Sequence, residues 1–124
     1  MHIRGISREL LDLLLSIGRE QHPHEFAGVL REEGGIIHEL NLLPGTTSNE
    51  HSARLFLDMM PLDTHIAGSA HSHPNGVLIP SDADLSFFPR VGGRYHCIVG
   101  YPYETGDWQF FSAEGTPIEL EVVE

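Results

Sequence analysis

The sequence predicts a mixed α/β domain of the α+β type, with a mainly antiparallel or mixed β-sheet and at least two helices. An amphipathic segment near the start of the chain has helical spacing, and short apolar runs between Gly- and Pro-containing turns follow it. The strict strand–helix alternation of a doubly wound parallel sheet is absent. With 124 residues, 40% of them hydrophobic, residues 1–124 are expected to form one domain with its own core.

The first helix is predicted from Ser7 to about Gln21. Ser7 suits the N-cap, and the apolar residues that follow it have helical spacing: Leu10, Leu11, Leu14, Leu15 and Ile17. Pro23 ends the helix, because proline lacks the N–H that another helical turn requires.

Strands are predicted along the rest of the chain. Residues 26–30 and 36–43 flank the turn at residues 33–35 and are expected to form a hairpin. A second, short helix is expected to open at Ser81 after a loop and to run to about Phe88. The remaining strands are expected at residues 54–59, 65–72, 95–101, 108–112 and 117–122.

The charge balance limits the classes of partner. Eighteen acidic residues against seven arginines give a formal charge of −11, which argues against a basic patch for nucleic acid or for an anionic membrane. The apolar run at residues 10–17 is interrupted by Asp12 and Ser16 and is too short to span a bilayer. One cysteine, Cys97, excludes an internal disulfide framework. The expectation is a soluble, cytoplasmic protein.

The segment His71-Ser72-His73-Pro74 has the spacing of a metal site. On one strand His71 and His73 point to the same face, with Cα atoms about 6.6 Å apart. Two imidazoles at that spacing can converge on one ion, with Zn–N bonds of about 2.0–2.1 Å. Pro74 cannot donate to a strand ladder, so the histidines are expected at the exposed end of the strand.

Ser81 and Asp84 extend this pattern. With Ser81 as N-cap, Asp84 lies in the first helical turn, although the same pair is also an ordinary cap with an acidic first turn. A His-His-Asp set leaves a fourth tetrahedral position open, as in catalytic rather than structural zinc sites. Glu25, between Pro23 and an apolar strand, is the best proton acceptor, unless it is a solvated loop carboxylate.

Together, Glu25, the His71-Ser72-His73 segment, Ser81 and Asp84 resemble the signature of the JAMM/MPN+ metalloproteases. Residues 23–30 (PHEFAGVL) also resemble that family's segment around its catalytic glutamate. The similarity covers nearly the whole chain and is greatest to small archaeal and bacterial single-domain members. It implies a curved mixed sheet flanked by helices, and one Zn²⁺ per chain held by His71, His73 and Asp84.

The resemblance also implies a chemistry. In the family pattern Glu25 accepts a proton from the attacking water and passes it to the leaving amine, while Ser81 steadies the oxyanion. Family substrates are isopeptide or peptide bonds after the Gly-Gly tail of ubiquitin or a ubiquitin-like protein, so a ubiquitin-like modifier and its conjugates are the expected partners. Two alternatives remain open: a non-catalytic MPN-type interaction domain, and a zinc hydrolase that processes a sulfur-carrier protein adduct.

Other conspicuous residues are expected to be structural. The histidines at positions 2, 22, 24, 38, 51, 65 and 96 lack metal-site spacing and are predicted to lie on the surface or to form local hydrogen bonds. Cys97 is predicted to be a small buried apolar residue rather than a nucleophile. Trp108, Phe110 and Phe111 are predicted to pack in the core and at the sheet edge.

Overall fold

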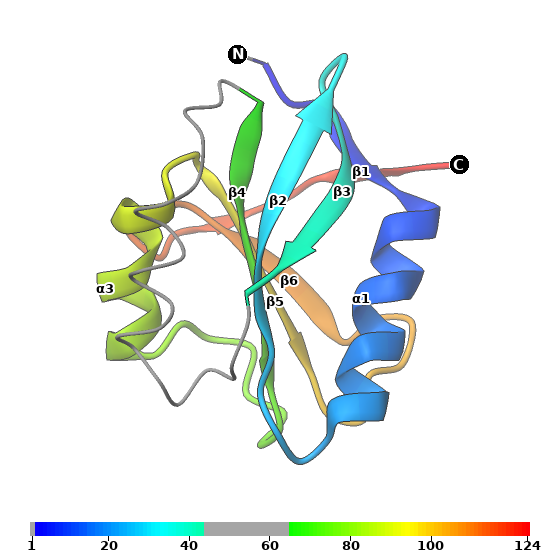
Figure 1. The fold of residues 1–124 in the computed structure, drawn as a ribbon, viewed down its shortest axis with the longest axis vertical. Helices are drawn as coiled ribbons and strands as arrows, with labels where there is room; N and C mark the ends of the chain where they lie inside the picture. Colours follow the sequence, from blue (N-terminus) through cyan, green and yellow to red (C-terminus); the bar gives the residue numbers. More distant parts are fainter. Residues whose placement is uncertain (1, 44–64) are drawn as a thin grey trace.

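The computed structural model describes residues 2–43 and 65–124, which form a mixed sheet between two helices (Figure 1). The sheet order is β7-β6-β5-β4-β2-β3-β1-β8. The elements are β1 (Gly5–Ser7), α1 (Arg8–Gln21), β2 (Ala27–Glu33), β3 (Ile36–Leu42), β4 (Ile66–His73), α3 (Asp82–Val91), β5 (Tyr95–Gly100), β6 (Trp108–Phe111), β7 (Pro117–Ile118) and β8 (Glu121–Val123).

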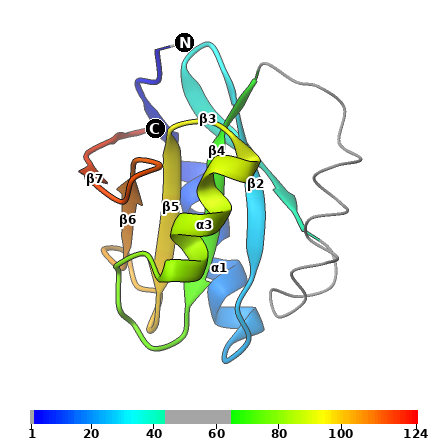
Figure 2. The same cartoon turned by 90° about the vertical axis from the view of Figure 1, so that its left-hand side faces the viewer.

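The two helices cover opposite faces of the sheet (Figure 2). Helix α1 begins where its sequence predicts, since the Ser7 hydroxyl accepts a hydrogen bond from the N–H of Leu10 at 3.1 Å. Helix α3 connects β4 to β5, and these neighbouring strands are parallel, as such a crossover connection requires. Neither helix is both long and apolar enough to cross a membrane within the described part of the chain.

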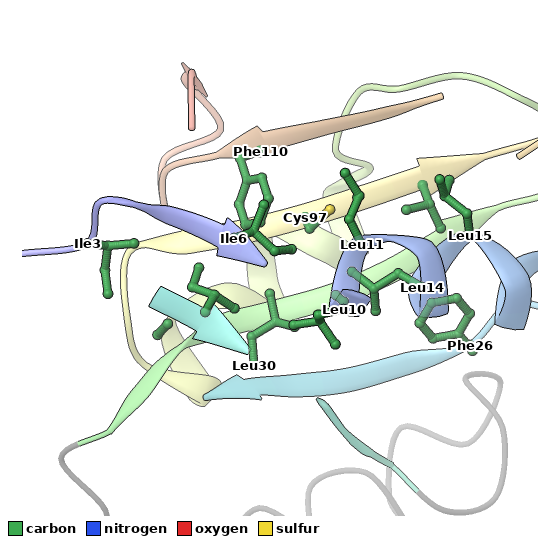
Figure 3. Close-up of a cluster of buried hydrophobic side chains, with 14 of the residues drawn as sticks. Ile3, Ile6, Leu10, Leu11, Leu14, Leu15, Phe26, Leu30, Cys97 and Phe110 are labelled. Atoms are coloured by element: carbon green, nitrogen blue, oxygen red, sulfur yellow. The ribbon is translucent and has the colours of Figure 1, made fainter. Parts of the chain in front are cut away.

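The main core lies between α1 and the sheet (Figure 3). The apolar face of α1 is buried there, as predicted, against side chains that include Ile6, Leu30 and Phe110. Cys97 is fully buried in the same cluster, and burial raises the pKa of its thiol well above the usual range. Its predicted role as a small apolar residue is therefore confirmed. Burial also confirms the packing roles of Phe110 and Phe111.

The termini of the described chain differ from the sequence prediction. Strand β1 was not predicted, because three residues are too few to show a periodic pattern; it pairs in parallel with both β3 and β8. The prediction of a single strand at residues 117–122 is wrong. Strand β7 pairs with β6 at one edge of the sheet, whereas β8 pairs with β1 at the other. The strand predicted at residues 54–59 lies outside the described residues.

Close approach of β4 to β5 requires glycine at position 68. A Cβ atom there would overlap the carbonyl oxygen of Tyr95, so Gly68→Ala is expected to lower the free energy of unfolding by about 1–3 kcal/mol. Gly106→Ala is the control, because nothing lies within 4 Å of the added Cβ; its effect should stay within about 0.5 kcal/mol. Urea unfolding measures both, and equal stability of the two variants would contradict this account.

Candidate metal centre

Strand β4 brings its two histidines to one face at its C-terminal end. It ends at His73, directly before Pro74, as predicted. The face is the one covered by α3, because the His71 ring lies 5.3 Å from the ring of Phe87 and 5.6 Å from that of Phe88, centroid to centroid. His73 follows two residues later and therefore points to the same face.

The start of α3 turns Asp84 toward these histidines. Ser81 is the N-cap, as predicted: its hydroxyl accepts a hydrogen bond from the N–H of Asp84 at 3.1 Å. In return, the backbone N–H of Ser81 donates to Asp84 Oδ2 at 2.9 Å, which completes a capping box. The cap thus fixes the direction of the carboxylate as well as the start of the helix.

His71, His73 and Asp84 come together as the sequence predicted. Asp84 Oδ2 lies 2.9 Å from His73 Nε2, and Asp84 Oδ1 lies 3.8 Å from His71 Nδ1. Two ligand atoms on a tetrahedral zinc with 2.0–2.1 Å bonds are about 3.3 Å apart, so the two distances bracket that value. All three side chains are largely buried, with 8%, 10% and 13% of their surface exposed, respectively.

The protonation states suit a metal site. Burial lowers the pKa of His71 to about 4, so this ring is neutral near pH 7 and keeps a lone pair. Burial alone would raise the pKa of Asp84, but the His73 hydrogen bond and the nearby His71 outweigh it and lower the pKa to about 2. The hydrogen bond that His73 donates to Asp84 raises the pKa of His73, so binding of an ion there would displace a proton.

Each histidine is also held through its other ring nitrogen. His73 Nδ1 lies 2.8 Å from the carbonyl oxygen of Val77, and His71 Nε2 lies 2.8 Å from the hydroxyl of Ser69. Metal-ligating histidines almost always have such an outer partner, which fixes the tautomer and the ring orientation. Neither partner is predicted by the sequence. Ser69 could have been found from its spacing, two residues before His71, whereas a backbone carbonyl leaves no signal in side-chain type.

The position of His96 differs from one of the two alternatives that the sequence predicts. It was expected on the surface or in a local hydrogen bond, but it is fully buried on β5, with Nδ1 2.7 Å from the Ser69 hydroxyl. Its ring stacks on Phe88 with centroids 4.1 Å apart. The surface alternative is therefore wrong, because pairing of β5 with β4 places His96 directly beside Ser69.

Strand pairing brings Glu25 to the same site. Phe26 and Ser72 are joined by two hydrogen bonds, at 2.8 Å from the Phe26 N–H to the Ser72 hydroxyl and at 3.1 Å from the Ser72 N–H to the Phe26 carbonyl. The β2–β4 register, continued by two residues beyond Ala27 and His71, sets Glu25 opposite His73 and on the same face. Its charge reaches the site, because it contributes to raising the pKa of His73. Glu25 is exposed at this position.

The donor set fits a zinc ion. Within residues 2–43 and 65–124, no three His, Cys, Asp or Glu side chains are placed so that they could hold a metal ion as they stand, and Asp84 is hydrogen-bonded directly to His73. Binding would require these two groups to contact the ion instead of each other. The chemistry favours that exchange, because a neutral imidazole, an anionic carboxylate and two outer-bonded histidines are what three-ligand zinc sites use.

Comparisons with known proteins agree with the fold. The model of the prokaryotic homologs of the JAB domain matches residues 7–114. A Haloferax volcanii protein described as "Probable metalloprotease" is 42% identical over 130 residues, which cover 97% of this chain and 80% of that protein.

Two solved structures are similar over almost their whole length. A JAB1/MPN domain protein from Archaeoglobus fulgidus has 37% identity and a TM-score of 0.80, with 97% of this chain and 99% of that one covered. Another, described as "JAMM: A Metalloprotease-like Zinc Site in the Proteasome and Signalosome", has 34% identity and a TM-score of 0.76, with coverage of 98% and 99%. These matches confirm the JAMM/MPN resemblance and the predicted fold class. The chain belongs to the family of prokaryotic homologs of the JAB domain.

Proposed function

We propose that this protein is a zinc-dependent hydrolase of peptide or isopeptide bonds. In this proposal His71, His73 and Asp84 hold one Zn²⁺ per chain, Glu25 is the proton acceptor, and Ser81 stabilises the oxyanion. The observation that carries the proposal is that the continued β2–β4 register sets an exposed carboxylate, Glu25, opposite His73, in the segment that leads into β2. The relative named as a metalloprotease and the neighbour described as a metalloprotease-like zinc site support it.

The protein's own groups divide the work of hydrolysis. When bound, the ion would lower the pKa of a water toward 7 and polarise the scissile carbonyl. Glu25 takes the proton from the attacking water and delivers it to the leaving nitrogen, a role that requires a carboxylate within hydrogen-bond reach of both atoms. The Ser81 hydroxyl accepts a hydrogen bond from the N–H of Asp84, so its own proton remains available for donation to the developing oxyanion.

For the substrate, we propose the bond that follows the C-terminal Gly-Gly tail of a ubiquitin-like modifier. This choice rests on the family resemblance and on the site's position at a strand end. Glycines have no side chain, so a Gly-Gly tail allows the substrate backbone to approach such a site closely. The modifier and its conjugates are then the partners, and the products are a free modifier tail and a free amine.

The direct test is incubation of the purified protein with ubiquitin-like conjugates from its own host, with and without a chelator. Release of the modifier, with its loss on chelation and recovery on addition of zinc, supports the proposal. Zinc binding without any cleavage would favour a non-catalytic MPN-type interaction domain. Cleavage of a sulfur-carrier adduct alone would change the substrate but keep the zinc chemistry.

Ser81→Ala separates the capping role of the hydroxyl from its catalytic one. Loss of a cap costs about 0.5–2 kcal/mol of stability, whereas loss of an oxyanion donor lowers kcat by about 10²–10³-fold. We expect Ser81→Ala to remain folded and to bind zinc, but to have a kcat lower by about 10²–10³-fold. Unfolding curves, zinc content and steady-state kinetics on the same preparation measure the three properties.

Ser86→Ala is the matched control, because Ser86 is an exposed serine within the same helix. It should retain the activity of the unsubstituted protein. If Ser81→Ala is less stable yet cleaves as fast as Ser86→Ala, Ser81 acts only as a helix cap.

A further inference from the structure

On the side of His71 that faces away from Asp84, three buried polar side chains form a continuous hydrogen-bonded chain, which consists of His71, Ser69 and His96. His71 Nε2 lies 2.8 Å from Ser69 Oγ, which in turn lies 2.7 Å from His96 Nδ1. Ser69 and His96 have no exposed surface, and His71 has only 7%. None of these contacts touches the reacting groups, so the chain can act on the site only through His71.

The far end of this chain is held rigidly. His96 pairs with Ser69 in the β4–β5 register, and its ring is stacked almost parallel on Phe88, with an 8° angle between the planes. Such stacking fixes the plane of the imidazole, and with it the direction of Nδ1 toward the Ser69 hydroxyl. His96 therefore cannot leave the chain without disrupting the packing beneath α3.

The number of protons in the chain limits it to two arrangements. Both rings are buried, and a neutral imidazole carries one proton. The Ser69 hydroxyl contributes one more and can donate in only one direction. Either His71 donates from Nε2 to Ser69, which donates to His96 Nδ1, or every bond runs the opposite way.

Only the first arrangement leaves a bare nitrogen at the candidate metal centre. With the proton on Nε2, His71 Nδ1 faces Asp84 as a lone pair, at 3.8 Å from Oδ1. In the reverse arrangement Nδ1 carries the proton and cannot bind a metal. The His96 proton then lies on Nδ1 rather than on Nε2, so the state of His96 reports on that of His71.

The surroundings of His96 leave Ser69 as the partner of its ring. The Nε2 atom of His96 is buried without a hydrogen-bond partner among the described residues, and its Nδ1 lies 2.7 Å from Ser69 Oγ. Among these residues, the Ser69 hydroxyl is therefore the group that couples His96 to His71.

We infer that Ser69 and His96 are positioning residues that hold His71 in the Nε2–H tautomer, so that its Nδ1 is free to bind the metal. The inference rests on the proposed function, because it takes His71 to be a zinc ligand. It assigns a role to a buried serine–histidine pair outside the ligand set and the proton acceptor.

Two substitutions break the chain at different points. Ser69→Ala removes the acceptor of the His71 Nε2–H. His96→Phe keeps an aromatic ring to stack on Phe88 but removes the acceptor of the Ser69 hydroxyl, which is then free to donate to His71 Nε2. In both variants the carboxylate of Asp84 is left to attract the His71 proton to Nδ1.

The first readout is the tautomer of His71 in metal-free protein, from the ¹⁵N shifts of its ring nitrogens. The unsubstituted protein should carry the proton on Nε2, and both variants should shift it toward Nδ1. The second readout is the zinc dissociation constant, which should rise by about 10–100-fold in each variant, as for other outer partners of ligating histidines. The double variant should bind zinc no more weakly than the single variant that binds it less tightly, because both substitutions act through the same hydrogen-bonded chain.

Cys97→Ala is the matched control: Cys97 is buried beside His96 on β5 but points to the opposite face, into the α1 core. It should lower stability without changing the tautomer or the zinc dissociation constant. A His71 proton on Nδ1 in the unsubstituted protein, or an unchanged tautomer in both chain variants, would overturn the inference. Failure of the unsubstituted protein to bind zinc would instead count against the proposed function, since the tautomer is measured without metal.

Discussion

Glu25→Gln is expected to keep its fold and its zinc but to lose at least about 10²-fold in kcat. Glutamine has nearly the shape of glutamate, and Glu25 is exposed at the end of the turn before β2, so the substitution disturbs little packing. It does remove the only group in the proposed mechanism that accepts a proton. Metal analysis and steady-state kinetics on the same sample test both parts of the expectation.

Glu20→Gln is the matched control, because it makes the same chemical change at an exposed position on α1. Its rate should equal that of the unsubstituted protein. If Glu25→Gln cleaves at that rate as well, the proton acceptor is another group. If it loses zinc along with activity, Glu25 contributes to metal binding rather than to proton transfer.

Removal of any one of His71, His73 or Asp84 is expected to abolish both zinc binding and activity. A site with three protein ligands has no spare ligand. Alanine at each position should therefore weaken zinc binding by more than the roughly 10–100-fold that loss of an outer partner costs. For Asp84, asparagine is the better substitution, because alanine would also remove the side-chain half of the capping box. Zinc titration and the cleavage assay measure the two losses.

His38→Ala serves as the control for the histidine variants. His38 lies on β3, with its Nε2 3.7 Å from Glu33 Oε1, outside the candidate centre. It should bind zinc and cleave substrate normally. Full zinc content in a His71→Ala/His73→Ala double variant would show that the metal lies elsewhere.

The site draws on parts of the chain that are far apart in sequence, and each part has a separate reason for its position. β4 supplies two histidines through its alternation, α3 supplies Asp84 through its capping box, and the segment leading into β2 supplies Glu25 through the pairing of β2 with β4. Loss of any one of these elements would leave an incomplete site. This dependence explains why a cap variant such as Ser81→Ala must be checked for stability and zinc before its rate is interpreted.

The sequence by itself determined the features that depend on neighbouring residues. Ser7 and Ser81 were predicted as N-caps because a hydroxyl bonds to an N–H three residues ahead, and both do so. His71 and His73 were predicted on one face because side chains alternate along a strand. Asp84 followed from its place in the first turn after the cap.

Only the tertiary structure decided the features that depend on pairing between distant segments. Residues 117–122 divide into β7 and β8 because their partners lie at opposite edges of the sheet, which no local pattern encodes. His96 is buried beside Ser69 because β5 pairs with β4. Glu25 lies opposite His73 because of the register of β2, and a shift of one residue would turn its side chain to the other face. Local hydrogen bonds and alternation act within a few residues, whereas register is set by the packing of the whole sheet.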